Sequence, residues 1–212
     1  FFVRLAIAFG NIDVDQTLVI RRDPARARAL RAGGLSPIEL PFGGRMDFRT
    51  RPALQREIER HKPDVILSWM SRASWATPAA RKPHNYKLIG RLGGYYDLKY
   101  YRHCDYLIGN TQDIVDHIVK AGFPHERAVY LPNFVHAPTR DVVSRLGLDT
   151  PGDAPLLLAM GRLHENKGFD VLLHAMVDLP ANWLWVAGEG REGPALARLA
   201  ANLGVADRVG CV

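Results

Sequence analysis

The amino-acid sequence predicts an α/β protein with two doubly wound parallel-sheet units, the second of them incomplete. Short apolar runs of strand length alternate with stretches of helical periodicity along all 212 residues, as expected of successive βαβ units. The runs are continuously apolar, which is typical of strands buried on both faces of a parallel sheet. A stretch bracketed by prolines and without periodicity, 131–139, separates two such series and predicts domains over 1–137 and 138–212.

Apolar runs and helix-end signals predict the strands and helices of the first series. Its strands are expected at Gln16–Ile20, Ile38–Leu40, Val65–Trp69, Lys87–Arg91, Tyr106–Ile108 and Val129–Leu131, and its helices at Pro24–Ala32, Arg51–Arg60 and Thr111–Ala121. Thr111 is expected to cap its helix and Gly122 to end it. The opening stretch, Phe1–Phe9, has one apolar face, and we expect a buried amphipathic helix rather than one docked on a membrane.

The second series is shorter and predicts a domain that is cut short. Its strands are expected at Leu156–Met160, Trp183–Ala187 and Arg208–Val212, and its helices at Asp141–Leu146, Phe169–Met176 and Glu192–Leu203. The glycine of the Leu203-Gly204 pair is expected to end the last helix.

Charge and composition restrict the class of function. No apolar run approaches the roughly 18 residues that span a bilayer. Cys104 and Cys211 match neither a zinc-binding spacing nor a redox motif, so two reduced thiols are expected. The net charge of +6 favours anionic partners, which include phosphorylated ligands and an acidic membrane surface. A solvated basic surface is the alternative. Because the basic residues are scattered and form no recognised module, no nucleic-acid partner is expected.

The loop after Leu156–Met160 carries the residues best suited to bind an anion. Ligands of open α/β sheets bind outside the carboxyl ends of the strands. Gly161 permits a sharp turn there, Arg162 offers a planar fork of donors for phosphate oxygens, and Lys167 adds a mobile point charge. A surface loop with two solvated cations is the alternative interpretation.

A second glycine-containing loop, Gly188-Glu189-Gly190, follows the next predicted strand. It does not complete a dinucleotide-binding GxGxxG motif and is weak evidence alone. Two such loops after consecutive parallel strands nevertheless predict one cleft lined by backbone amides. Glu189 is interpreted either as a hydrogen-bonding partner of a ligand or as a carboxylate that interacts with the helix dipole.

At this point the sequence resembles a known family. The pattern Gly-Arg-Leu-x-x-x-Lys-Gly-x-Asp-x-Leu-Leu-x-Ala at 161–175 is similar to the signature of the donor domain of family 4 retaining glycosyltransferases, and 188–190 with 199–204 continue it in register. The stretches 105–111, 120–124 and 129–135 resemble the end of the acceptor domain of these enzymes. The resemblance implies a GT-B fold, in which two Rossmann-like domains hold the acceptor (1–137) and the nucleotide-sugar donor (138–212).

The resemblance also implies roles for particular residues. Gly161, Arg162 and Lys167 would bind the donor diphosphate, and Gly188, Glu189 and Gly190 would form a donor loop. Two cations can balance the charge of the departing nucleoside diphosphate without a metal, so neither a metal nor another cofactor is expected. The anomeric configuration of the sugar would be retained.

Some features of the family pattern are not found. The family places a glycine-rich loop after its first strand and an E-x7-E pair further along the donor domain. The resemblance therefore implies a fragment that lacks the extreme N-terminus and the C-terminal part of the donor domain. The loops at 68–72 and 92–96 carry no histidine of the kind that many relatives have there, so no catalytic residue is nominated. Arg72 is the candidate on the acceptor side, with a solvated arginine as the alternative.

These observations predict a glycosyltransferase of polysaccharide or lipopolysaccharide biosynthesis. It would transfer a sugar from a nucleoside-diphosphate sugar to a hydroxyl of a glycan or lipid-linked acceptor. We expect it in the cytoplasm, with peripheral contact with the anionic inner face of the membrane as a further expectation. Two alternatives stay open: a nucleotide- or phosphate-binding module without transferase activity, and another GT-B enzyme such as a sugar-nucleotide epimerase.

Overall fold

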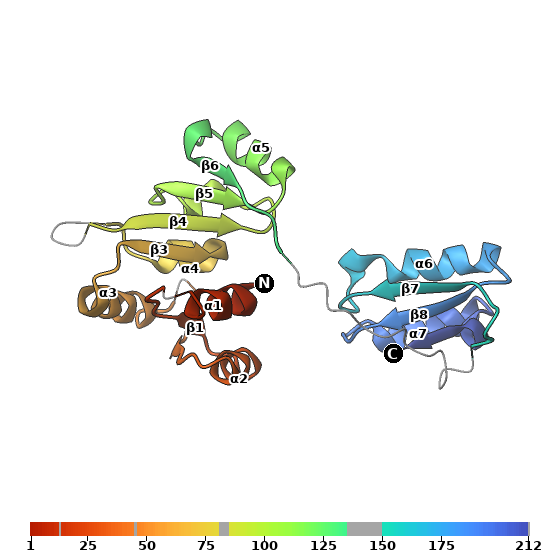
Figure 1. Cartoon of the computed structure of the whole chain (residues 1–212). Helices are drawn as coiled ribbons and strands as arrows, with labels where there is room; N and C mark the ends of the chain where they lie inside the picture. The colour runs from red at the N-terminus through yellow and green to blue at the C-terminus, as the bar shows by residue number, and fades with distance from the viewer. Residues whose placement is uncertain (13, 45, 81–84, 135–149, 212) are drawn as a thin grey trace. The chain divides into compact units, whose positions relative to one another are not determined.

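The computed structural model describes residues 1–12, 14–44, 46–80, 85–134 and 150–211 (Figure 1). The chain divides into two compact units, Phe1–Ala137 and Pro138–Val212, and each is described here by itself. The helix predicted at Asp141–Leu146 lies outside the described residues.

The first unit contains two parallel sheets. In the smaller sheet β1 (Val19–Arg21) pairs with β2 (Ile38–Leu40). The larger sheet has the order β3-β4-β5-β6, with strands at Val65–Trp69, Lys87–Leu92, Tyr106–Gly109 and Ala128–Tyr130. All its pairings are parallel. The carboxyl ends of the strands of each sheet therefore lie along one edge.

One predicted strand is shorter than expected. β1 begins at Val19, whereas the apolar run suggested a start at Gln16. The Gln16 side chain donates a hydrogen bond to the carbonyl of Ala6, 2.6 Å away. This segment is therefore fixed against the first helix instead of pairing with a strand.

Five α-helices are described in the first unit. They are α1 (Phe2–Gly10), α2 (Pro24–Ala32), α3 (Thr50–His61), α4 (Met70–Ala76) and α5 (Gln112–Lys120). The predicted cap of α5 is confirmed, because the Thr111 hydroxyl accepts a hydrogen bond from the Ile114 amide at 3.2 Å. The buried amphipathic helix at the start is also confirmed, since Ala6 packs in a cluster with Ile20, Ala27 and Leu30.

Helix α4 was not predicted from the sequence. Strand β3 passes into it without a connecting loop, and Met70 takes a φ of +66° at the junction. A non-glycine residue rarely adopts this left-handed conformation, so the sequence pattern gives no signal for the turn.

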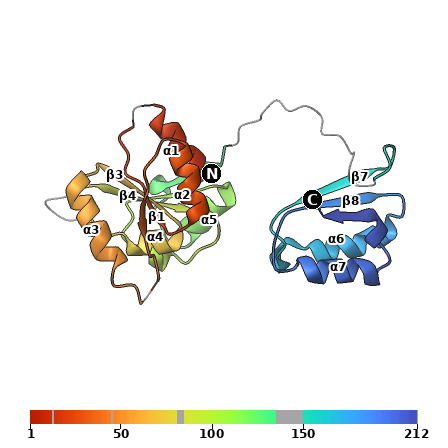
Figure 2. The same cartoon turned by 90° about the horizontal axis from the view of Figure 1, so that it is seen from below.

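The second unit is a parallel sheet of order β7-β8-β9, with strands at Leu156–Met160, Trp183–Ala187 and Val209–Cys211. Helices α6 (Phe169–Ala175) and α7 (Gly193–Asn202) lie together on one side of it (Figure 2). Their core contains Leu173, Leu184 and Val186. On β7, Leu158 and Met160 are 58% and 74% exposed, so the described helices leave the other face of the sheet uncovered.

The last strand begins one residue later than predicted. Arg208 ends a 3-10 turn before β9, and its guanidinium donates hydrogen bonds to the carbonyls of Leu179, Asn182 and Met176 at 2.8, 2.9 and 3.2 Å. The side chain ties the start of β9 to the turn after α6, which the sequence pattern alone does not reveal.

Candidate functional site

Backbone hydrogen bonds join the two loops that follow β7 and β8. The amide of Gly161 donates to the carbonyl of Ala187 at 3.0 Å, and that of Leu163 donates to the carbonyl of Glu189 at 2.9 Å. The amide of Glu192 in turn donates to the carbonyl of Leu163 at 3.3 Å. The pairing of β7 with β8 is thus continued beyond the strands, and the loops form one structural element at the carboxyl edge.

Gly188 and Gly190 allow this close approach. A Cβ on Gly188 would lie 2.0 Å from the carbonyl oxygen of Gly161, and one on Gly190 would lie 2.1 Å from that of Leu163. Both distances are far inside van der Waals contact with backbone that cannot move aside. The structure thus gives the two glycines a packing role, and the donor-loop role that the sequence suggested for them stays a prediction.

Arg162 and Lys167 project from this paired element as exposed cations. Leu163 is 6% exposed and packs in the core of the unit, which anchors the loop beside Arg162. The Cδ and Cε atoms of Lys167 come within 3.9 Å of where a Cβ on Gly161 would stand, so the predicted residues Gly161 and Lys167 are brought together. Within the described part of the chain, neither cation forms a hydrogen bond or an ion pair.

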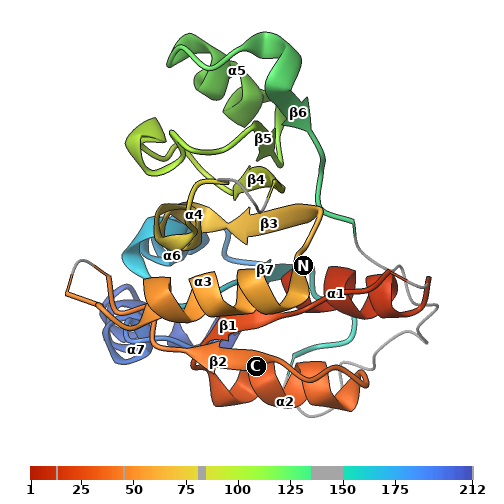
Figure 3. The same cartoon turned by 90° about the vertical axis from the view of Figure 1, so that its left-hand side faces the viewer.

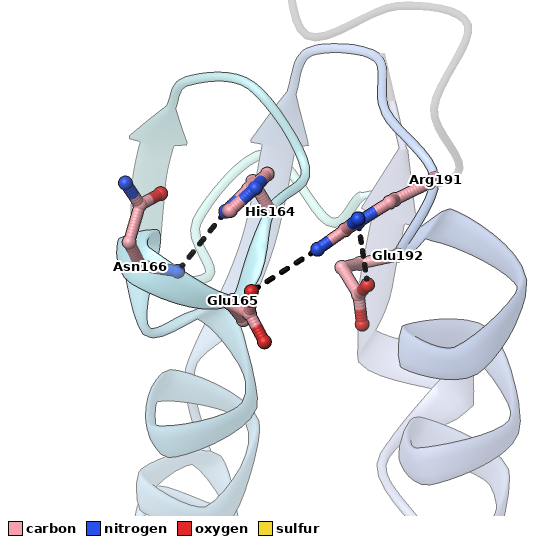
Figure 4. A network of polar contacts seen from close by, with 5 residues as sticks. All are labelled: His164, Glu165, Asn166, Arg191 and Glu192. Atoms are coloured by element: carbon pink, nitrogen blue, oxygen red, sulfur yellow. Dashed lines mark hydrogen bonds and ion pairs between the residues drawn. The ribbon is translucent and has the colours of Figure 1, made fainter.

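A polar clip, Arg191 with Glu165 and Glu192, connects the two loops (Figure 4). Arg191 Nη2 lies 3.0 Å from Glu165 Oε1, and Arg191 Nε lies 3.4 Å from Glu192 Oε1. In the same loop, the ring Nδ1 of His164 accepts a hydrogen bond from the Asn166 amide at 3.3 Å. The side chains of Arg191 and Glu165 are 65% and 72% exposed, and an exposed ion pair contributes little stability. The clip therefore marks where the two loops meet, and the backbone hydrogen bonds and glycines hold them together.

A shallow pocket beside the clip is unsuited to a diphosphate. Its lining includes His164 and the carboxylates Glu165, Asp170 and Glu192, and it includes neither Arg162 nor Lys167. A concentration of negative charge disfavours an anionic ligand. An anion is therefore better accommodated at the exposed cations than in this pocket.

The acceptor-side candidate Arg72 lies on α4 and is exposed. Its Nη1 donates a hydrogen bond to the carbonyl of Phe42 at 3.3 Å, and it lines a small pocket together with Arg51 and Asp47. A second arginine of this unit, which sequence reasoning did not single out, is also of interest.

That second residue is Arg91, at the end of β4, which is only 4% exposed. Its guanidinium carbon lies 4.7 Å from the ring centroid of Phe1 and 4.8 Å from that of Trp69. Its Nη2 donates to Asn133 Oδ1 at 2.6 Å. Burial lowers the pKa of Arg91, and the aromatic faces and the amide oxygen stabilise its positive charge. The sequence shows it only as the last residue of an apolar run.

Two observations concern membranes and metals. Among the described residues, no helix is long and apolar enough to cross a membrane, and no group of three or more histidine, cysteine or acidic side chains is placed to hold a metal ion. The sequence Asp13-Val14-Asp15 has the Asp-x-Asp form of a metal-binding motif, but it precedes β1, and Asp13 lies outside the described residues.

Comparisons with known proteins agree with this architecture. The lipopolysaccharide core biosynthesis glycosyltransferase LpsE of Rhizobium meliloti (strain 1021) is 36% identical over 224 residues, covering 99% of this chain and 61% of the relative. LpsD of the same organism is 32% identical over 216 residues, covering 99% and 60%. The chain thus spans about 60% of the length of these curated relatives.

Among solved structures, Anabaena HepE in complex with UDP superposes with a TM-score of 0.73 at 17% identity, covering 99% of this chain and 65% of that one. The predicted fold class is confirmed: both units are Rossmann-like and of the GT-B type, and three strands of the second are present. Residues 1–137, which carry the four-stranded sheet, match Glycosyltransferase Family 4. By this match and by its likeness to LpsE and LpsD, the chain belongs to glycosyltransferase family 4.

Proposed function

We propose that this chain is the part of a glycosyltransferase that binds a nucleoside-diphosphate sugar through Arg162 and Lys167. The enzyme transfers the sugar, with retention of configuration, to a hydroxyl of a glycan or lipid-linked acceptor. In this proposal the first unit takes the acceptor and the second the donor. Arg72 is the residue proposed to contact the acceptor.

The observation that carries the proposal is the paired loop element at the carboxyl edge of β7 and β8. It presents two cations with no ion-pair partner in the described residues, beside Gly161. An arginine fork and a lysine point charge suit the oxygens of a diphosphate. As the glycosidic bond breaks, negative charge develops on the leaving diphosphate, and the two cations stabilise it.

The names of the similar proteins support the choice of ligands. The solved structure of HepE contains UDP, and LpsE and LpsD are named for lipopolysaccharide core biosynthesis. We therefore propose UDP-sugars as the first donors to test and a lipopolysaccharide core glycan as the first acceptor. The enzyme would work at the cytoplasmic face of a membrane, in peripheral contact with it.

Calorimetric titration of the 212-residue chain with UDP, ADP and GDP tests the donor site. We expect Arg162→Ala and Lys167→Ala each to weaken binding by roughly tenfold to a hundredfold, because each removes a charge-assisted contact worth about 1.5–3 kcal/mol. We propose that no metal is needed, so binding should be unchanged in the presence of a chelator.

Arg198→Ala is the matched control, because Arg198 is an exposed arginine on α7 outside the loop element. It should bind UDP as the unmodified chain does. Equal binding by Arg162→Ala and the unmodified chain would show that the diphosphate role is wrong. Sugar transfer from UDP-sugars by the full-length protein then separates a transferase from a binding module that lacks activity.

A further inference from the structure

The loop between β2 and α3, residues 41–49, presents two apolar side chains to solvent. Met46 is 83% exposed and Phe48 is 80% exposed, which leaves both almost entirely in contact with water. The loop follows β2 and leads into α3 (Figure 3), and its residue Phe42 is buried against Leu54 and Ala76. Large apolar side chains this exposed are unfavourable in water and indicate a surface that contacts something else.

Asp47, which lies between them, holds the loop in place. Its carboxylate accepts hydrogen bonds from the amides of Gly43, Arg49 and Thr50 at 2.7, 2.9 and 3.0 Å, and from the Thr50 hydroxyl as well. The hydroxyl bond and these amide bonds hold the pKa of Asp47 far below its usual range, so the carboxylate stays ionised and its oxygens are occupied. The exposed apolar side chains are therefore fixed on a constrained loop.

Three arginines lie on or beside the loop that carries the apolar pair. Arg49 and Arg51 are exposed at the start of α3, and Arg72 lines the same small pocket as Arg51. Within the described residues none of the three is in an ion pair. The carboxylate in this pocket is that of Asp47. Three arginines thus stand against one carboxylate, and the loop and the residues beside it carry a net positive charge.

We propose that this loop docks the protein on an anionic lipid bilayer. Met46 and Phe48 enter the boundary between headgroups and acyl chains, and Arg49, Arg51 and Arg72 lie against lipid phosphates. Apolar insertion combined with cationic attraction is how peripheral proteins bind anionic membranes. The inference rests on the membrane contact proposed above, and it names the segment that makes that contact.

The small size of the apolar surface favours a bilayer over a protein partner. A stable protein interface buries about 800 Å² on each side, and two side chains on a loop supply only a fraction of this. A bilayer needs no matching flat surface, because lipids rearrange around whatever inserts. Charge complementarity then determines which lipids are preferred.

Flotation of the 212-residue chain with vesicles tests the proposal. The probes are vesicles of phosphatidylcholine alone and of phosphatidylcholine with phosphatidylglycerol, each at low and high salt. We expect binding to the anionic vesicles only, weakened by salt. The double variant Met46→Ser/Phe48→Ser should reduce binding on the order of tenfold. The double variant Arg49→Gln/Arg51→Gln should reduce it roughly fivefold for each arginine removed.

Ile12→Ser and Arg60→Gln are the matched controls. Ile12 is 66% exposed but precedes β1, so it lies toward the amino edge of the sheet, and Arg60 is an exposed residue in the last turn of α3. Both should bind vesicles as the unmodified chain does. Equal binding by Met46→Ser/Phe48→Ser and the unmodified chain overturns the proposal, as does equal binding to both kinds of vesicle.

The vesicle assay contains no nucleotide, so its result is independent of the donor site. Loss of vesicle binding with intact UDP binding is the expected result for the loop variants. Because the donor site lies in the second unit, circular dichroism and thermal unfolding are measured as well, and an unchanged Tm shows that the first unit of each variant is folded. If the unmodified chain binds no vesicles yet binds UDP, the docking proposal fails while the donor-site proposal stands.

Discussion

Gly190 shows how a single residue shapes the candidate donor site. A Cβ at this position would lie 2.1 Å from the carbonyl oxygen of Leu163, with the carbonyl carbon and amide nitrogen of Leu163 both at 2.8 Å. All three atoms belong to backbone, which cannot rotate away as a side chain can. An added methyl group must therefore separate the loops that present Arg162 and Lys167.

We expect Gly190→Ala to lower the free energy of unfolding by about 1–3 kcal/mol, as overpacking typically does. It should also weaken UDP binding, because the separated loops no longer hold the cations together. Denaturant unfolding and calorimetry measure the two effects. Gly152→Ala is the control, since a Cβ on Gly152 would meet no atom within 4 Å. Identical UDP binding by the two variants would contradict the packing role.

At the scale of an element, α3 ends in a strained conformation. Its last residue is followed by Lys62, which has a φ of +45° and donates its amide to the carbonyl of Ile58 at 2.8 Å. Glycine is favoured at this position because it has no Cβ to clash with the adjacent carbonyl. Lys62 is exposed, so its side chain contributes little packing.

Lys62→Gly is therefore expected to stabilise the first unit, by about 1 kcal/mol, as the left-handed conformation costs a non-glycine residue about that much. Thermal unfolding measures the gain as a rise in Tm. Arg56→Gly, in the middle of the same helix, should instead lower stability by about 1 kcal/mol. A fall in Tm for both variants would show that Lys62 makes a favourable contact.

Elements also show where sequence patterns succeed and fail. Strands β2, β3, β7 and β8 have the bounds that their apolar runs predicted, because an apolar run of strand length can be recognised without knowing which strand it pairs with. Helix α4 was missed, since Met70 turns the chain without glycine or proline. The start of β1 was displaced by a side-chain bond between Gln16 and Ala6, and no local pattern encodes such a contact.

For the whole molecule, the hydrophobic cores divide in the same way as the proposed functions. Leu107 is fully buried in a core of the first unit, and Leu184 is fully buried in the core of the second. Each unit therefore has its own source of stability.

We expect Leu107→Ala and Leu184→Ala each to cost about 2–5 kcal/mol in the unit that contains it. On heating, Leu184→Ala should lose UDP binding at a lower temperature while vesicle binding is kept, and Leu107→Ala should show the reverse. Parallel calorimetry and flotation over a temperature series measure both functions. If each variant loses the two functions together, the units unfold as one.

The sequence by itself determined the order along the chain of the described strands and α-helices other than α4, and the place of Arg162 and Lys167 after a strand. These features are encoded within a few residues by apolar periodicity and by the rule that parallel sheets bind ligands at their carboxyl edge. The tertiary structure alone showed that Gly188 and Gly190 join two loops, and that Arg191 reaches Glu165, 26 positions away.

Only the tertiary structure showed that Arg91 contacts Asn133, 42 positions away. It also showed that Asp47 fixes the loop that carries Met46 and Phe48. Such contacts form only when separate segments have packed, and their partners share no spacing that a linear pattern could reveal. The local sequence thus identified the two cations that are proposed to bind a diphosphate. Packing determined which backbone atoms hold them there, and which apolar side chains were left facing the solvent.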